Sequence, residues 1–194
     1  MTVRAQDSGP ALEARAATVA VGLVVGFAAL VMTFGALLLA YGLVRVQATA
    51  EGAAWPPAGE RRLLAVAWPF ALAATLTAVL GSRAAQLASR NSRAPALSAA
   101  ALAGWGFVAI QVLTARHLLA LGIHPSSGLA ASVLYALGTF HALHATAAAL
   151  VMSRLAIRSR CGEVVRTTTV RAAAAFVHLV TALWLVIGLA VFVW

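Results

Sequence analysis

The stretch Tyr135-Ala-Leu-Gly-Thr-Phe-His141-Ala-Leu-His144 decides the fold, because it places two imidazoles inside a long run without charged residues. The uncharged run extends from about residue 127 to residue 153, which is enough to cross a bilayer as one helix. His141 and His144 are three residues apart and therefore share one helix face. A polar side chain at the centre of a bilayer is costly unless it meets protein, water or a partner. The sequence therefore predicts that this face points into a helical bundle.

The whole chain has the composition of an integral membrane protein. Of its 194 residues, 62% are hydrophobic and only 10% are charged, whereas about a quarter of the residues in a soluble domain are charged. The net charge of +9 comes from arginines that lie between apolar runs rather than along one face, which argues against nucleic-acid binding. The single cysteine, Cys161, excludes an internal disulfide and a cysteine-rich metal site.

The apolar runs predict an all-α membrane protein with five transmembrane helices. Residues 1–15 read as a flexible N-terminal tail, and residues 16–194 as a single transmembrane domain. The spans are predicted at about 16–43, 63–82, 95–114, 129–153 and 172–194. The polar start of the chain does not resemble a cleavable signal peptide, so we expect the first helix to be retained.

The distribution of arginines predicts the orientation in the membrane. Ten of them lie in the N-terminal tail and in the second and fourth loops, and the other four are Arg45, Arg61, Arg62 and Arg116. Because positive charge is enriched on the cytoplasmic side, we expect the N-terminus inside and the C-terminus outside. Arg45, Arg61 and Arg62 are then candidates for binding lipid headgroup phosphates on the outer side.

A third histidine, His178, lies in the last predicted span, and the positions in the spans put all three imidazoles between the midplane and the inner face. They could face one another there and bind a metal or a haem, since imidazole is the commonest transition-metal ligand. The alternative, which we favour, is that each ring bonds a backbone carbonyl or a hydroxyl such as that of Thr139 or Thr181. We therefore assign no catalytic residue and no metal ligand. No acid lies within any predicted span, which argues against a proton pump or a cation-coupled transporter.

Three motifs, in the same order along the chain, resemble subunit III of the haem-copper respiratory oxidases. Gly138-Thr-Phe-His-Ala-Leu-His144 is similar to the Gly-Phe-His-Gly-Leu-His signature of that family. Trp55-Pro56-Pro57 is similar to its Trp-Pro-Pro loop, and Phe176-Val-His178-Leu-Val-Thr-Ala-Leu-Trp184 to its last helix. The resemblance extends from Tyr41 to the C-terminus.

The resemblance implies a five-helix, subunit III-like bundle in the inner membrane of a bacterium. Such a subunit is not catalytic: it packs on the catalytic subunit I, binds phospholipid and supports stability and the access of protons and oxygen. Haem and copper would lie in that partner, with no cofactor in this chain. The residues implied to be structural are Trp55, Pro56, His141, His144, His178 and Trp184. The carboxylate that the family usually has three residues after the last-helix histidine is replaced by Thr181, so the family's role in proton uptake does not carry over with it.

Two further interpretations stay open. A subunit III-like accessory subunit of a bacterial nitric oxide reductase is favoured by the missing carboxylates, because a reductase that does not pump protons has no need of them. A stand-alone b-type cytochrome would instead use His141, His144 and His178 as haem ligands. A small transporter has less support, because the sequence shows no inverted repeat.

Overall fold

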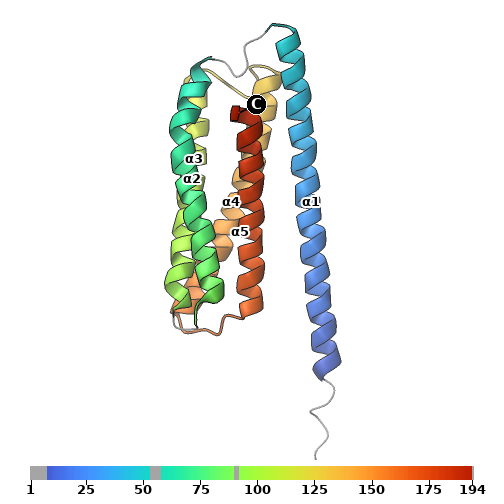
Figure 1. Ribbon diagram of the computed structural model, residues 1–194, viewed down its shortest axis with the longest axis vertical. Helices are drawn as coiled ribbons and strands as arrows, with labels where there is room; N and C mark the ends of the chain where they lie inside the picture. The colour runs from blue at the N-terminus through green and yellow to red at the C-terminus, as the bar shows by residue number, and fades with distance from the viewer. Residues whose placement is uncertain (1–7, 53–57, 90–91, 194) are drawn as a thin grey trace, which may run out of the picture.

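The computed structural model describes residues 8–52, 58–89 and 92–193, and these form helices joined by short loops (Figure 1). No β-strand occurs in these three ranges. The helices are α1 (Ser8–Ala50), α2 (Ala58–Leu87), α3 (Arg93–Ala120), α4 (Leu129–Arg160) and α5 (Thr167–Gly188), which continues as a π-helical turn, η1 (Leu189–Val193).

Four segments are long and apolar enough to cross a membrane, which confirms the predicted all-α membrane protein. They are Ala17–Ala50, Arg93–Ala120, Leu129–Arg160 and Thr167–Val191, from α1, α3, α4 and α5. About 20 predominantly apolar residues suffice to span a bilayer, and each segment exceeds that length. Among the residues described, α2 is a helix of 30 residues but is not one of these four segments.

The helices extend beyond the predicted spans. The first begins at Ser8, inside the predicted tail, and α4 runs to Arg160 rather than to Ser153. Hydropathy predicts only the part of a helix that lies in lipid, whereas backbone hydrogen bonding continues into water where residues such as arginine and alanine favour the helix. Pro10 is compatible with the start of α1, because a residue in the first turn needs no amide donor.

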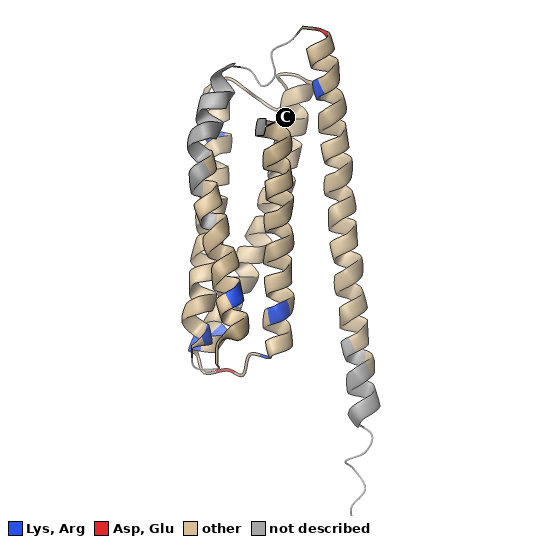
Figure 2. Cartoon of the chain, viewed as in Figure 1, with Lys and Arg blue, Asp and Glu red and all other residues tan. Residues whose placement is uncertain are grey.

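Helices α2, α3, α4 and α5 form a bundle in which successive helices run in opposite directions, and α1 leans against α4 and α5 (Figure 1). We call the end with the α2–α3 and α4–α5 loops the basic end, because seven of the described arginines lie in it. They are Arg83, Arg93, Arg154, Arg158, Arg160, Arg166 and Arg171. The opposite end, called the far end, holds the α3–α4 loop and η1, with Arg45 and Arg116 (Figure 2).

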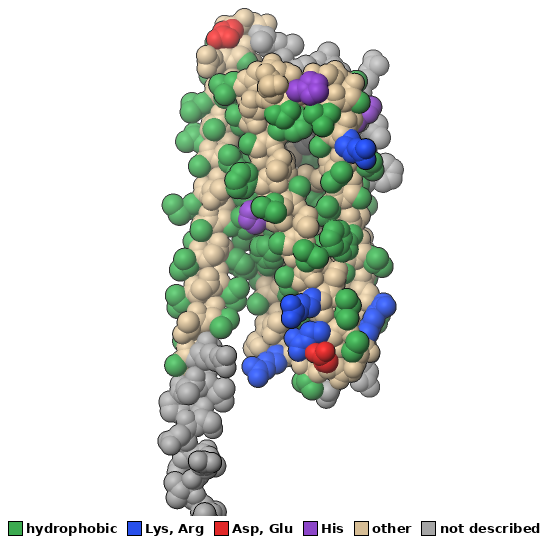
Figure 3. All heavy atoms as spheres, turned by 180° about the vertical axis from the view of Figure 1, so that it is seen from behind, with side chains coloured by type: hydrophobic (Ala, Val, Ile, Leu, Met, Phe, Trp, Pro, Cys, Tyr) green, Lys and Arg blue, Asp and Glu red, His purple; other side chains and the backbone are tan. Residues whose placement is uncertain are grey.

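Arg93 fastens the two loops of the basic end to each other. Its guanidinium donates to the carbonyl oxygens of Val165 and Ala88 at 3.2 and 3.3 Å and to the Thr167 hydroxyl at 3.3 Å. These bonds join the start of α3 to the end of α2 and the start of α5. The described arginines lie toward the two ends, and apolar side chains predominate over the middle of the face that Figure 3 shows. Such a predominantly apolar surface fits a protein surrounded by lipid.

Small residues bring the helices together near the basic end. Gly81 of α2 lies against α3 so closely that a Cβ atom there would be 2.8 Å from the backbone nitrogen of Ala100. Gly104 of α3 lies against Ala149 of α4 in the same way, at 3.1 Å from the alanine methyl group. In lipid, close backbone approach of this kind holds helices together through dispersion forces.

The contact at Gly81 predicts that Gly81→Ala destabilises the bundle. The added methyl group overlaps the backbone of α3, so we expect the free energy of unfolding to fall by about 1–3 kcal/mol. The matched change Gly106→Ala adds a methyl group where no atom lies within 4 Å, and should raise it by about 0.5–1 kcal/mol. Unfolding by denaturant in mixed micelles measures both. Equal shifts in the two variants would contradict the close α2–α3 contact.

Candidate functional site

His141 lies at the centre of the bundle, 1% exposed, and hydrogen-bonds to two neighbouring helices. Its Nε2 lies 3.1 Å from the carbonyl oxygen of Val180 on α5, and its Nδ1 lies 2.8 Å from Nε2 of Gln111 on α3. A carbonyl oxygen only accepts, so Nε2 carries the hydrogen and donates it. In the neutral ring Nδ1 then accepts from the Gln111 amide. His141 therefore links α4 to α3 and α5, with both ring nitrogens engaged.

His144 lies one turn further along α4 and faces α1. Its Nδ1 donates to the carbonyl oxygen of Phe140, 2.7 Å away in the same helix. Phe34 of α1 is fully buried and meets both imidazoles edge-on, with its ring centroid 6.1 Å from that of His141 and 5.7 Å from that of His144. The histidine pair is thus the place where α1 packs onto α4.

His178 does not complete a metal site with this pair. Across the part of the chain that is described, no group of three or more His, Cys, Asp or Glu side chains is placed to hold a metal ion. His178 follows Val177 and precedes Val180, both of which are buried, and is itself only partly buried. The structure therefore brings together two of the three histidines that the sequence suggested as neighbours.

An aromatic cluster of α2, α3 and α5 side chains packs against His141. Trp184 of α5 stacks on Trp68 of α2, with ring centroids 4.5 Å apart and planes at 25°. Phe107 of α3 meets Trp184 edge-on at 5.6 Å and His141 edge-on at 5.4 Å. Gly188 provides space for this cluster, because a Cβ atom there would overlap the ring of Trp68. His141 and Trp184, which belong to different motifs of the sequence, thus lie in one cluster.

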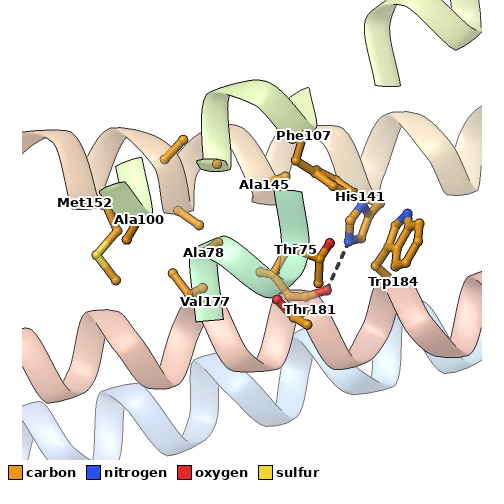
Figure 4. Close-up of a pocket in the computed structure, with 14 residues that line it drawn as sticks. Thr75, Ala78, Ala100, Phe107, His141, Ala145, Met152, Val177, Thr181 and Trp184 are labelled. Carbon is orange, nitrogen blue, oxygen red and sulfur yellow. Dashed lines mark hydrogen bonds between the residues drawn. The ribbon is translucent and has the colours of Figure 1, made fainter. Parts of the chain in front are cut away.

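A small cavity of about 40 Å³ adjoins His141 on the side of the basic end (Figure 4). Alanine and valine side chains line much of it, and the hydroxyl groups of Thr75 and Thr181 are its polar groups besides His141. A water molecule needs about 10–15 Å³ of such volume, so the space accommodates a few waters and no organic cofactor.

A large cavity of about 410 Å³ lies on the other side of His141, toward the far end. Residues of α2, α3, α4 and α5 line it, with His141 and Trp184 at its inner limit and Arg116 nearer the far end. Small-molecule sites usually measure about 300–1,000 Å³, so this volume is large enough for a ligand.

The remaining predicted residues lie at the far end or outside the described residues. Arg45 donates from Nη1 to the carbonyl oxygen of Ala190, 3.1 Å away in η1, so it fastens the end of α1 to the end of α5. The sequence suggested only a lipid headgroup for it. Trp55 and Pro56 lie outside the described residues, and the side chains of Arg61 and Arg62 are likewise not described.

Sequence reasoning missed three residues that contact His141: Gln111, Phe34 and Phe107. Of these, only Gln111 carries a signal that could have identified it. An amide isolated in an apolar span requires a partner inside the bundle for the same reason as a histidine does. Phe34 and Phe107 are ordinary apolar residues of their helices.

No protein-family model matches the chain, and no curated protein is significantly similar to it. The residues of the cluster and the motifs in the sequence are therefore the basis for a functional proposal.

Replacing His141 by leucine should destabilise the protein more than the same change at His144. His141→Leu leaves the buried amide of Gln111 without its partner, which costs about 1–3 kcal/mol of unfolding free energy. His144→Leu removes a bond within one helix and keeps an apolar contact with Phe34, so we expect a loss below about 1 kcal/mol. Tryptophan fluorescence during unfolding in mixed micelles measures both. Equal losses would show that the bonds of His141 do not hold the bundle together.

Proposed function

We propose that this chain is a non-catalytic accessory subunit of a bacterial haem-copper terminal oxidase, similar to subunit III and located in the inner membrane. In this role it packs on the catalytic subunit I, binds phospholipid and supports the stability of the complex and its access to protons and oxygen. The observation that carries the proposal is that residues from two separate sequence motifs lie next to each other in the structure. His141 of the Gly138–His144 motif and Trp184 of the last-helix motif both contact Phe107.

The hydrogen bonds of His141 support a role in packing rather than in chemistry. Both of its nitrogens are engaged, and no acid lies within any of the five spans predicted from the sequence to provide a general base. A b-type cytochrome would need an imidazole nitrogen free to bind iron, and His141 does not offer one. Haem and copper accordingly belong to the partner subunit in this proposal.

The location of the arginines supports five spans with the N-terminus inside. The basic end holds seven described arginines against two at the far end (Figure 2). Positive charge is enriched on the cytoplasmic side, so the basic end is cytoplasmic. Helix α2 runs alongside α3 in the bundle and serves as the fifth span.

Helix α1 is the best candidate for the contact with subunit I. In the most apolar stretch of 18 residues of α1, only 11% of the residues are buried within the chain, compared with 28%, 28% and 44% in the corresponding stretches of α3, α4 and α5. Of these four helices, α1 therefore leaves the largest share of its apolar residues open to its surroundings. A helix that packs so little against its own bundle has a free face for another subunit or for lipid.

A nitric oxide reductase is the second candidate for the partner complex. The residue three positions after His178 is Thr181, and its hydroxyl lines the small cavity where the oxidase family usually has a carboxylate. A reductase without a proton pump has no need of that carboxylate. The identity of the catalytic subunit recovered with this chain distinguishes the two complexes.

Purification from native membranes in a mild detergent tests the proposal. A tag on the N-terminus of the full chain should recover a many-helix, histidine-rich subunit with haem, identified by mass spectrometry and by the absorbance of the complex. The chain expressed alone should show no haem absorbance. A stable solitary species that binds haem in stoichiometric amounts would refute the accessory role and support the cytochrome.

Reporter fusions at both ends test the orientation. Alkaline phosphatase fused after Trp194 should be active and a fluorescent protein at that position dark, because the far end is placed outside. A fluorescent protein fused before Met1 serves as the matched control and should fluoresce. Cytoplasmic signal from both ends would instead show an even number of spans.

A further inference from the structure

We propose that the large cavity binds one acyl chain of an anionic phospholipid, whose phosphate group is held by Arg116. The proposal makes the phospholipid binding of the proposed function specific, and it rests only on the placement of the chain in a membrane. It does not depend on which complex recruits the chain.

The cavity is long and runs parallel to the helices. Its lining on α3 extends from Ile110 to Leu119, and its lining on α4 extends from Leu134 to Ala142. At a rise of 1.5 Å per residue, these segments are about 14 and 12 Å long. A hydrocarbon chain in a bilayer lies along the same direction, so this shape suits a chain better than a compact ligand.

The interior of the cavity is mostly apolar, with a few uncharged polar side chains of α3 and α4 in its lining, and its inner limit is uncharged. Leucine, isoleucine, valine and alanine side chains form most of the lining. At the inner limit the nitrogens of His141 are already bonded to Gln111 and Val180, so they do not require a polar ligand. Empty apolar space of this volume forfeits dispersion contacts, and an acyl chain from the surrounding lipid restores them.

Arg116 supplies the charge that selects an anionic lipid. It lines the cavity, its side chain is exposed, and among the described residues it has no hydrogen bond or ion pair. It lies five residues beyond Gln111 on α3, about 7.5 Å closer to the far end, where headgroups would be. A guanidinium binds phosphate oxygens through two parallel hydrogen bonds, so phosphate is the natural partner.

Filling the cavity tests the acyl-chain site. Gly138 lines the cavity, and a Cβ atom there meets no atom within 4 Å, so Gly138→Leu places a side chain in the space without a backbone clash. Gly106→Leu is the matched control, because Gly106 is an exposed glycine of α3 that has the same free space but does not line the cavity. Helical circular dichroism and a single size-exclusion peak check that both variants fold.

The full chain is reconstituted with an equal mixture of phosphatidylglycerol and phosphatidylcholine and analysed by native mass spectrometry. The wild type and Gly106→Leu should each retain one phosphatidylglycerol, and Gly138→Leu should retain none. Arg116→Gln should lower the preference for phosphatidylglycerol over phosphatidylcholine about fivefold, whereas Arg171→Gln, at the basic end, should leave it unchanged.

Equal retention of phosphatidylglycerol by folded Gly138→Leu and the wild type would overturn the proposal. Retention of a neutral lipid or a quinone in its place would overturn it as well, because Arg116 would then select nothing. Should Gly138→Leu fail to fold, the Arg116→Gln comparison alone decides whether an anionic headgroup is bound. The reconstituted chain contains no oxidase subunit, so a negative result here is distinct from failure to recover a partner complex.

Discussion

The constraint on which the structure depends is that a polar group surrounded by hydrocarbon must find its partner within the protein. His141 meets this requirement with the amide of Gln111 on one side and the carbonyl oxygen of Val180 on the other. Two directional bonds to two different helices fix the rotation and height of α4 relative to both. The aromatic rings of Phe34, Phe107 and Trp184 then pack against helices that already have a defined register.

Packing differs between the two ends of the bundle. Near the basic end, Gly81 and Gly104 let α2, α3 and α4 approach so closely that the space between them is almost filled. Beyond His141 the rings of Trp68 and Trp184 stack on each other between α2 and α5, and both line the large cavity. Arg45, bonded to Ala190, joins α1 to the end of α5 at the far end.

Hydropathy predicted the helical membrane protein correctly, and the placement of an imidazole pair in an apolar run predicted that His141 points inward. The ends of the helices differed from the ends of the predicted spans, because an apolar sequence is needed only within the lipid, whereas backbone hydrogen bonding continues beyond it. The isolation of Gln111 in an apolar span indicates that it faces into the bundle, but its pairing with His141 could not be predicted, since the pairing depends on how α3 is rotated against α4. Val177 and Val180 are the inward-facing positions of this part of α5. His178 lies about 100° around the helix from Val177 and about 200° from Val180, so it does not lie beside His141 although the sequence put both at a similar depth.

The length of α1 has a geometric consequence. Its 43 residues give a rod of about 65 Å, whereas a bilayer with its headgroups measures about 45 Å. One end of the rod is tied to α5 through Arg45, so the excess of about 20 Å accumulates at the other end, where α1 projects past the bundle (Figure 1). Phe34 of the same helix meets both imidazoles, so a contact between α1 and the histidine pair exists that does not involve the loops.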